Sequence, residues 1–546
     1  MRNEILQLLL IVLSQLVYLC VTHQTKPELE HKQQHSFSAQ LQMLNLPEQH
    51  LIRYINSFPQ LKDACQRDSG CSRSVTAKVA ACWGHERNCT AAARFQTPAC
   101  PGDHTGWVQS KQAQLNTFYS QADFGYIQQQ IDELTLMCEP TYLTDSALEC
   151  TKYLRFCRGR NLLFDFSDLL QRKELIRYQM DVLKQGQVAG HCQLNSSRLN
   201  AELDHLGALQ SWAPEMRYFT ELPMPVAGSE LCDVVVETPT FIMKIDSTYN
   251  MYHHFCDFFN LYASLFVNLS HPMAFHRDIR ILIWETYPYE SPFADTFEAF
   301  TQHPVWTLNE VKGKRVCFKN VVMPLLPRMI FGLYYNTPII FGCQNSGLFR
   351  AFSEFILHRL QVPFQQPQLL NTPKVRITLL SRRTKYRRVL NEEELLQEIE
   401  SDARYQVRRI SFESGLPFRE QLAITRNTDV LIGMHGAGLT HLLFLPNWAS
   451  IFELYNCEDP NCYKDLARLR GVNYLTWLHK EYVHPQDAGH HPQGGAHAKF
   501  TNYSFDRKEF ARLVKQAAEH VLSHPDFLKY QEASVGDSLN ARKNEL

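Results

Sequence analysis

The sequence predicts an α/β protein in which two Rossmann-like domains face a cleft, after a cysteine-rich and mainly helical region. Three observations lead to this fold class. Apolar runs of strand length alternate with stretches of helical spacing, which is typical of parallel sheets. The alternation occurs in two series, at 216–370 and 371–530, and each is long enough for one domain. Ten of the 16 cysteines lie between Cys65 and Cys232, and apolar residues at helical spacing occur among them at 123–134.

The two ends of the chain predict a protein of the secretory pathway. Residues 1–22 have the order of a signal peptide, with Arg2, an apolar run from Ile5 to Cys20 and a polar exit. An uncleaved membrane anchor is the alternative, but a bilayer needs about 20 apolar residues, so we expect no stable membrane span. The tail, 531–546, resembles a signal for an endoplasmic-reticulum retention receptor in its last four residues, Lys543, Asn544, Glu545 and Leu546. We therefore expect the protein in the lumen of the endoplasmic reticulum.

The cysteine-rich region, 23–215, indicates disulfides formed in an oxidising compartment. We expect Cys457 to pair with Cys462 across a short polar loop, and Cys65 to pair with Cys71 likewise. No Cys-x-x-Cys pair occurs, which argues against a zinc site made of cysteines. The number of cysteines after Cys20 is odd, so at least one thiol should stay free or pair with another chain.

Charge and sequence motifs bear on the partners of the chain. The net charge is −1, which argues against a nucleic-acid partner. Four Asn-x-Ser/Thr triplets predict acceptors for N-linked glycans, at Asn88, Asn195, Asn268 and Asn502. The histidine-rich segment 483–498 offers metal ligands, but its Pro and Gly content favours a solvated surface loop.

Polar residues follow the strands that we expect in the second series. The strand at 375–380 is followed by Arg382 and Arg383, and the strand at 430–434 by His435. The carboxyl ends of parallel strands meet at one edge of a sheet, so these residues should share a crevice. Next come Gly436, Ala437 and Gly438. Small residues at the start of a helix let free N–H groups approach a ligand, which suits a diphosphate.

The same crevice has further candidate ligands. Arginine binds phosphate oxygens with two parallel hydrogen bonds, and Glu453 and Asn456 at the end of the strand 451–454 are candidates to grip a ribose. The alternative is a solvated arginine loop beside an ordinary tight turn. The six-residue dinucleotide fingerprint is absent here, so a nicotinamide cofactor is less favoured.

The first series carries a histidine-rich segment, 250–257, with the sequence Asn-Met-Tyr-His-His-Phe-Cys-Asp. It follows an expected strand at 241–245, so it should line the cleft from the opposite side. His253, His254 and Asp257 are candidates to take a proton from a hydroxyl, with His254, Asp257 and His435 our choice of catalytic residues. The alternative is a packed helix whose histidines have internal partners.

These motifs together resemble those of glycosyltransferase family 61. The resemblance is carried by the segment 250–257, by Gly-Met-His-Gly-Ala-Gly-Leu-Thr-His at 433–441, and by Phe-Glu-Leu-Tyr-Asn-Cys-Glu-Asp at 452–459. It extends from about residue 46 to the C-terminus and includes the cysteine-rich region. It implies a fold of the GT-B type, with the donor bound in the second domain.

The resemblance implies a reaction as well. It implies an inverting transfer of N-acetylglucosamine from UDP-N-acetylglucosamine to Ser or Thr in folded EGF-like repeats, as in Notch-type receptors. It also implies help from Mn²⁺ or Mg²⁺, although Thr301-Gln-His-Pro304 stands where relatives carry acidic residues, and Asp295 is the nearest candidate ligand. A transferase for another acceptor, such as an O-mannosyl glycan, and a non-catalytic glycan-binding protein remain as alternatives.

Overall fold

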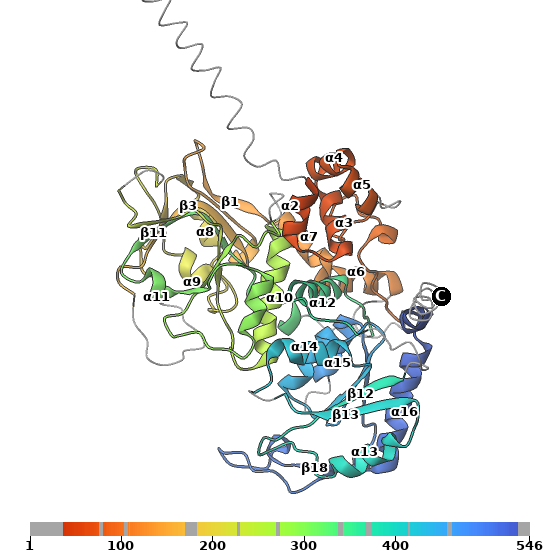
Figure 1. Cartoon of the computed structure of the whole chain (residues 1–546). Coiled ribbons are helices and arrows are strands. Elements are labelled where there is room, and N and C mark those ends of the chain that lie inside the picture. The colour runs from red at the N-terminus through yellow and green to blue at the C-terminus, as the bar shows by residue number, and fades with distance from the viewer. Residues whose placement is uncertain are drawn as a thin grey trace, which may run out of the picture.

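The computed structural model describes residues 37–75, 80–102, 108, 110–169, 183–226, 230–268, 274–336, 342–365, 374–412, 415–455 and 461–532. The predicted signal peptide and retention tail lie outside these residues, as do Asn456, Cys457 and the side chain of Cys462. The chain forms a bundle of helices, a large mixed sheet and a smaller parallel sheet (Figure 1). No helix within the described residues is both long and apolar enough to cross a bilayer.

The N-terminal bundle contains α2 (Phe37–Leu44), α3 (Glu48–Ser57), α4 (Pro59–Arg67), α5 (Ser69–Val75), α6 (Lys111–Ala122) and α7 (Phe124–Asp132). Buried Asp123 ties this bundle to the rest of the molecule. Its carboxylate accepts hydrogen bonds from the N–H of Phe124, at the start of α7, and from the N–H of Gly347 and Leu348. The last two begin helix α12 (Gly347–Arg359), so one side chain caps two helices.

The prediction of a mainly helical N-terminal region is not confirmed beyond α7. Residues 135–221 form strands of the large sheet, namely β1 (Thr135–Glu139), β2 (Ala147–Cys150), β3 (Cys157–Asp165), β4 (Val188–Gly190), β5 (Gln193–Leu194) and β6 (Phe219–Glu221). Among the described residues of this range, short helices interrupt them, namely the 3-10 helix η2 (Lys152–Leu154), α8 (Ser196–Ala201) and α9 (Ala213–Met216). Most of these strands have five residues or fewer, so local periodicity does not reveal them.

The large sheet combines a parallel part with an antiparallel part. Its main path runs β10-β9-β8-β11-β3-β2-β1-β5. The parallel part consists of β8 (Thr240–Met243), β9 (Arg280–Ile283), β10 (Trp306–Thr307) and β11 (Arg315–Met323), with β7 (Val234–Val236) also beside β11. Strand β3 runs antiparallel to β11 over its whole length. The expectation of a purely Rossmann-like first domain is therefore not confirmed.

The described residues contain six disulfides, between Cys65 and Cys343. The predicted pair Cys65–Cys71 is confirmed. The others are Cys82–Cys89, Cys100–Cys343, Cys138–Cys192, Cys150–Cys157 and Cys232–Cys317. The buried thiol of Cys256 is unpaired, which agrees with the expected odd cysteine. The pairing of Cys457 with Cys462 stays a prediction.

The smaller sheet follows the predicted alternation closely. Its five parallel strands are β12 (Val375–Leu380), β13 (Tyr405–Ile410), β14 (Val430–Gly433), β15 (Ser450–Glu453) and β16 (Asn473–Thr476), in the order β13-β12-β14-β15-β16. Helices α13 (Glu392–Glu400) and α16 (Arg507–Ser523) pack on one face, in contact with Ile377 and Ile432. On the other face lie α14 (Phe418–Arg426), the 3-10 helix η5 (Ala437–Phe444) and α15 (Cys462–Arg470).

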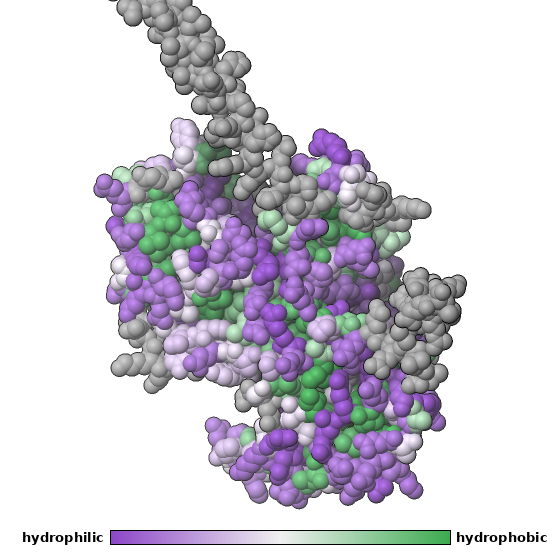
Figure 2. Space-filling model, in the orientation of Figure 1, coloured by the Kyte–Doolittle hydropathy of each residue, from purple (hydrophilic) through white to green (hydrophobic). Residues whose placement is uncertain are grey.

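The two sheets are joined by packed helices. Helix α10 (Met251–Val267) lies between the large sheet and the helices that cover one face of the smaller sheet (Figure 1). The ring of Phe255 on α10 lies 5.6 Å from that of Phe418 and 5.4 Å from that of Phe444. One hydrophobic core therefore runs from the large sheet to η5 and α14. The surface is indented between the two units on the side away from the C-terminus (Figure 2).

Candidate active site

The predicted crevice of the smaller sheet lies between β12 and β14. The chain leaves β12 toward β13 on one side and returns to β14 on the other, so the carboxyl ends of β12 and β14 form a topological switch point. Arg382 follows β12, and Gly436 follows β14. A Cβ atom added to Gly436 would lie only 2.6 Å from Nη1 of Arg382 and 3.4 Å from Nη1 of Arg387.

Two positive charges converge at this switch point. The pKa of Arg382 is lowered to about 10, first by burial and then by the positive charge of Arg387. Nη1 of Arg387 donates to the carbonyl of His435 at 2.9 Å. Within the described part of the chain, neither guanidinium makes an ion pair with a carboxylate. Two half-buried cations without a counter-ion favour an anion in the space that they face.

The backbone of this crevice also favours an anion. Gly436 has φ +155°, a conformation that L side chains rarely adopt, and it precedes the first residue of η5. The free N–H groups of η5 begin at Ala437 and Gly438, beside the guanidinium of Arg382. The predicted cluster of Arg382 with the glycine turn is thus present, and its donors are of the kind that bind a diphosphate.

His435 is held by a buried carboxylate. Its Nδ1 lies 2.6 Å from Oε1 of Glu453, and the hydroxyl of Tyr474 donates to Oε2 of Glu453 at 2.7 Å. Glu453 is fully buried, so it lies beneath His435 and not at an open ribose site. This arrangement fixes the orientation of the imidazole and of the His435 carbonyl that Arg387 binds.

The second arginine of the crevice is Arg387, and not Arg383 as the sequence predicted. The side chain of Arg383 is exposed, whereas that of Arg387 is half-buried over Gly436. The turn that returns Arg387 to the crevice is held by a hydrogen bond from its N–H to the carbonyl of Thr501 at 2.8 Å. No local signal in the sequence indicates this contact, because its partner lies more than a hundred residues away.

Of the two adjacent histidines on α10, His254 faces the core. It is fully buried, with Nδ1 3.0 Å from Oδ2 of Asp257 and Nε2 2.7 Å from the hydroxyl of Tyr289. Burial lowers the pKa of His254 to about 3. Both ring nitrogens of His254 are occupied, and Asp257 also accepts from the N–H of Asp246. Neither predicted side chain reaches the surface in this arrangement.

His253 faces the opposite way and reaches solvent. Its Nδ1 lies 2.9 Å from Oδ2 of Asp246, and Asp246 also accepts from Nε of Arg328 at 2.7 Å. Nη2 of Arg328, which can only donate, lies 2.9 Å from the same Nδ1. The tautomer of His253 therefore decides whether Nδ1 donates to Asp246 or accepts from Arg328. When Nδ1–H donates to Asp246, Nε2 is the acceptor, and no described group bonds to it.

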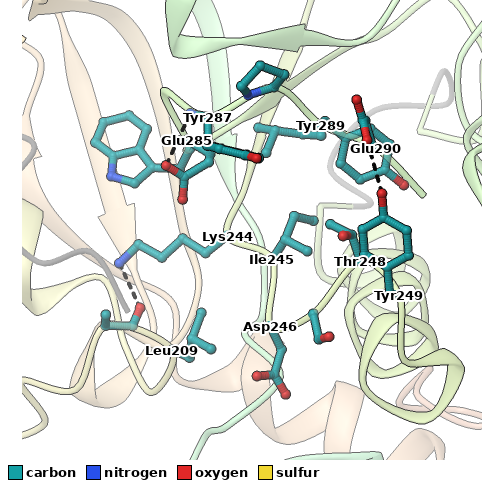
Figure 3. A pocket seen from close by; sticks show the side chains of 15 residues that line it. Leu209, Lys244, Ile245, Asp246, Thr248, Tyr249, Glu285, Tyr287, Tyr289 and Glu290 are labelled. Carbon is teal, nitrogen blue, oxygen red and sulfur yellow. Dashed lines mark hydrogen bonds between the residues drawn. The ribbon is translucent and has the colours of Figure 1, made fainter. Parts of the chain in front are cut away.

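A pocket opens beside this histidine at the carboxyl ends of β8 and β9. Its volume is about 290 Å³, and Figure 3 shows its wall. Asp246, Glu285 and Glu290 supply carboxylates, and Tyr249, Tyr287 and Tyr289 supply aromatic rings and hydroxyls. The hydroxyl of Tyr249 donates to Glu290 at 3.0 Å. Carboxylates beside aromatic rings suit a neutral ligand rich in hydroxyl groups.

Tyrosines connect His253 with His435 of the cationic crevice. The ring of Tyr335 lies 5.6 Å from that of His253 and 5.9 Å from that of Tyr252. The ring of Tyr252 lies 5.8 Å from that of Tyr463, which lies 5.4 Å from the ring of His435. The two carboxyl edges therefore meet along one continuous seam of rings.

Comparisons with known proteins agree with this geometry. Residues 251–452 match the family model described as Glycosyltransferase 61. A Drosophila melanogaster protein named EGF domain-specific O-linked N-acetylglucosamine transferase is 69% identical over 92% of this chain and 95% of its own length. Proteins of the same name from Mus musculus and Pan troglodytes are 46% and 45% identical, over 91% and 90% of their lengths.

The chain belongs to glycosyltransferase family 61. The family match begins at Met251, the first residue of α10, and ends at Phe452 in β15. It therefore includes His253 on one side of the tyrosine seam and Arg382, Arg387 and Gly436 on the other. The match also includes Glu285 and Glu290 of the pocket, but it begins after β8 and Asp246.

Asp295, the candidate metal ligand of this glycosyltransferase, lies near an arginine of the same chain. Oδ2 of Asp295 lies 3.9 Å from Nε of Arg419, and Arg419 also pairs with Glu298. Among the described residues, the only cluster with metal-ligand geometry is Cys82, Glu86 and Cys89, and its two cysteines form a disulfide. The described residues around Asp295 do not fit a divalent ion, because they form no group of three ligand side chains with metal-binding geometry.

Proposed function

We propose that this chain transfers N-acetylglucosamine from UDP-N-acetylglucosamine to Ser or Thr hydroxyls of folded EGF-like repeats, with inversion at the sugar carbon. One observation carries the proposal. Two uncompensated guanidiniums lie over the glycine turn of a switch point, in a family 61 chain that is 69% identical to a protein named for this reaction. The proposal extends to proteins with EGF-like repeats, such as Notch-type receptors, as acceptors.

On the donor side, the diphosphate lies against the start of η5. N–H groups at Ala437 and Gly438 and the guanidiniums of Arg382 and Arg387 bind its oxygens. As the bond between the sugar C1 and the β-phosphate oxygen breaks, negative charge grows on UDP. These donors are already in place, so they stabilise the leaving group more strongly than the intact donor.

On the acceptor side, His253 takes the proton. The acceptor oxygen attacks C1 of N-acetylglucosamine from the face opposite UDP, and its proton passes to Nε2 of His253. Asp246 accepts from Nδ1–H and stabilises the resulting imidazolium. The pocket of Asp246, Glu285 and Glu290 holds the hydroxyl-rich part of the reacting pair. The reaction releases UDP and a proton and forms one glycosidic bond.

The proposal includes an architecture and a location. The large sheet and the smaller sheet act as the two facing halves of a GT-B-like enzyme, with the acceptor side at 216–370 and the donor side at 371–530. We propose the lumen of the endoplasmic reticulum as the site of action, through the signal peptide and the last four residues, 543–546. Deleting 543–546 should then release active enzyme into the medium.

One experiment tests the function directly. The purified chain is incubated with UDP-N-acetylglucosamine and a folded EGF-like repeat, and the product is weighed by mass spectrometry. We expect one added N-acetylhexosamine and one equivalent of UDP. Modification of an O-mannosyl peptide and not of the EGF repeat would favour the other acceptor, and glycan binding without release of UDP would favour a non-catalytic protein.

A further inference from the structure

A strip of exposed apolar side chains borders the acceptor side of the site. It consists of Leu206, Ile330, Phe331 and Tyr335, and each is classed among the exposed large hydrophobic residues. Phe331 is the most open, with 64% of its surface exposed. Exposed apolar side chains that lie together indicate a contact surface for a macromolecule. We call this set the rim strip.

Hydrogen bonds and ring contacts join the segments that carry the rim strip. The carbonyl of Ile330 accepts from Nη2 of Arg155 at 3.1 Å. The cation of Arg155 lies 5.3 Å from the ring centre of Tyr153, which stacks on His205 at 4.2 Å. The N–H of Arg328 donates to the carbonyl of Leu209 at 3.0 Å. The loops 205–209 and 328–331 therefore lie side by side.

The strip is continuous with the reaction site. Ala208 and Leu209, next to Leu206 in the chain, line the pocket drawn in Figure 3. At its other end, the ring of Tyr335 lies 3.6 Å from the guanidinium carbon of Arg328 and 5.6 Å from the ring of His253. A partner that covers the strip therefore extends directly to the proposed base.

The backbone beneath the strip is held in unusual conformations. Tyr153, Leu154, Phe331 and Tyr334 all have φ between +50° and +69°, which non-glycine residues rarely adopt. Such conformations persist only where the surrounding contacts enforce them, and they occur often at ligand clamps. Phe331 is thus presented on a rigid support, so its ring loses little freedom when a partner covers it.

We propose that the rim strip is the docking surface for the folded EGF-like repeat. The inference rests on the proposed function and names the surface that recognises its acceptor. A transferase that acts on folded repeats has to contact the repeat outside the single hydroxyl that reacts. An exposed aromatic side chain at the centre of a protein–protein contact contributes strongly to affinity, which is the role we assign to Phe331.

The test compares substitutions on the strip with one elsewhere. Phe331→Asn suits the chain because asparagine tolerates positive φ, and Ile330→Ser removes the neighbouring apolar side chain. Leu478→Ser is the matched control, since Leu478 is 74% exposed but follows β16 of the smaller sheet. We expect at least a tenfold rise in KM for the folded repeat in each rim variant, with unchanged UDP-N-acetylglucosamine affinity by calorimetry. The control should behave as wild type.

Other outcomes separate the two ideas. If the wild-type enzyme modifies no folded repeat, the proposed function itself is wrong. Wild-type transfer together with an unchanged acceptor KM in both rim variants would overturn the docking surface alone. A change of molecular mass in solution, from dimer to monomer in Phe331→Asn without a change of acceptor KM, would assign the strip to a second copy of this chain and would also overturn the proposal.

Discussion

The two sheets end in crevices of opposite charge. The crevice after β12 and β14 is cationic, with Arg382 and Arg387 beside a glycine turn. The pocket after β8 and β9 has more carboxylates than cations. Asp246, Glu285 and Glu290 lie among its tyrosines, and its lysine, Lys244, is paired with Glu215. Both occupy the same position relative to their strands, namely the carboxyl edge of a parallel sheet, where open α/β sheets bind ligands.

The contrast explains how one molecule serves two reactants. The leaving group gains negative charge during transfer, so cations at its side stabilise the transition state. The acceptor hydroxyl loses a proton, so its side needs an acceptor and not another cation. Placing the two functions on separate sheets keeps Arg382 and Arg387 away from the proposed base. The cation beside His253, Arg328, is paired with Asp246. The seam of Tyr252, Tyr335 and Tyr463 brings the two edges together.

The largest effect should come from filling the cationic crevice. Gly436→Val places a branched side chain at φ +155° and within 2.6 Å of Nη1 of Arg382, so we expect transfer to fall to background. Gly415→Val is the control, because a Cβ at Gly415 meets nothing within 4 Å. Transfer to a folded repeat and donor affinity are measured with circular dichroism as a check on folding. Wild-type donor affinity in Gly436→Val would place the diphosphate elsewhere.

The adjacent histidines on α10 should separate chemistry from stability. His253→Gln removes the proposed base, and we expect kcat to fall about a hundred- to ten-thousandfold with little change in thermal stability. His254→Gln disturbs the buried pair with Asp257, so we expect the loss mainly in Tm. Steady-state kinetics and thermal unfolding of both variants provide the comparison. Equal kcat values for His253→Gln and wild type would remove His253 from the reaction.

The arginines of the cationic crevice should act on the donor. A charge-assisted hydrogen bond contributes roughly 1.5–3 kcal/mol, so Arg382→Ala and Arg387→Ala should each lose about ten- to a hundredfold in kcat/KM for the donor. The loss should appear in kcat as well as in affinity, because charge grows on UDP during the reaction. Arg383→Ala, on the exposed side of the same turn, should lose less. A larger loss in Arg383→Ala than in Arg387→Ala would reverse the assignment.

The sequence predicted the cationic half better than the acidic half, for a physical reason. In the smaller sheet each strand pairs with strands that follow it closely in the chain, so local periodicity and the glycine turn were sufficient. In the large sheet local pattern also predicted the strands that became β8 and β9. It did not reveal that β3 pairs with β11 or that strands from the cysteine-rich region join the sheet. Neither could periodicity choose between His253 and His254, because Asp246 and the packing of Tyr289 decide which ring faces solvent.

The smallest expected effect is on the dependence of folding stability on pH. Each of the two sides has one buried histidine that contributes to it. Burial lowers the pKa of His254, on the acidic side, to about 3, and that of His441, in η5 on the cationic side, to about 4. In the unfolded chain both titrate near 6.5. The folded protein keeps both rings neutral, so the unfolded state binds more protons below that pH.

Stability should therefore be complete above pH ~6.5 and decrease as the pH falls toward 4, by up to about 1.4 kcal/mol per pH unit for each histidine. His441→Phe removes one of the two histidines that bind a proton in the unfolded chain. Its Nδ1 bonds only to the carbonyl of Gly438, and its ring already packs against Phe412 and Phe418, so phenylalanine suits the site. Unfolding by denaturant at pH 7 and pH 5 should show a smaller acid loss in His441→Phe than in wild type. The same loss in both proteins would mean that the ring of His441 stays neutral in the unfolded chain or becomes protonated within the fold.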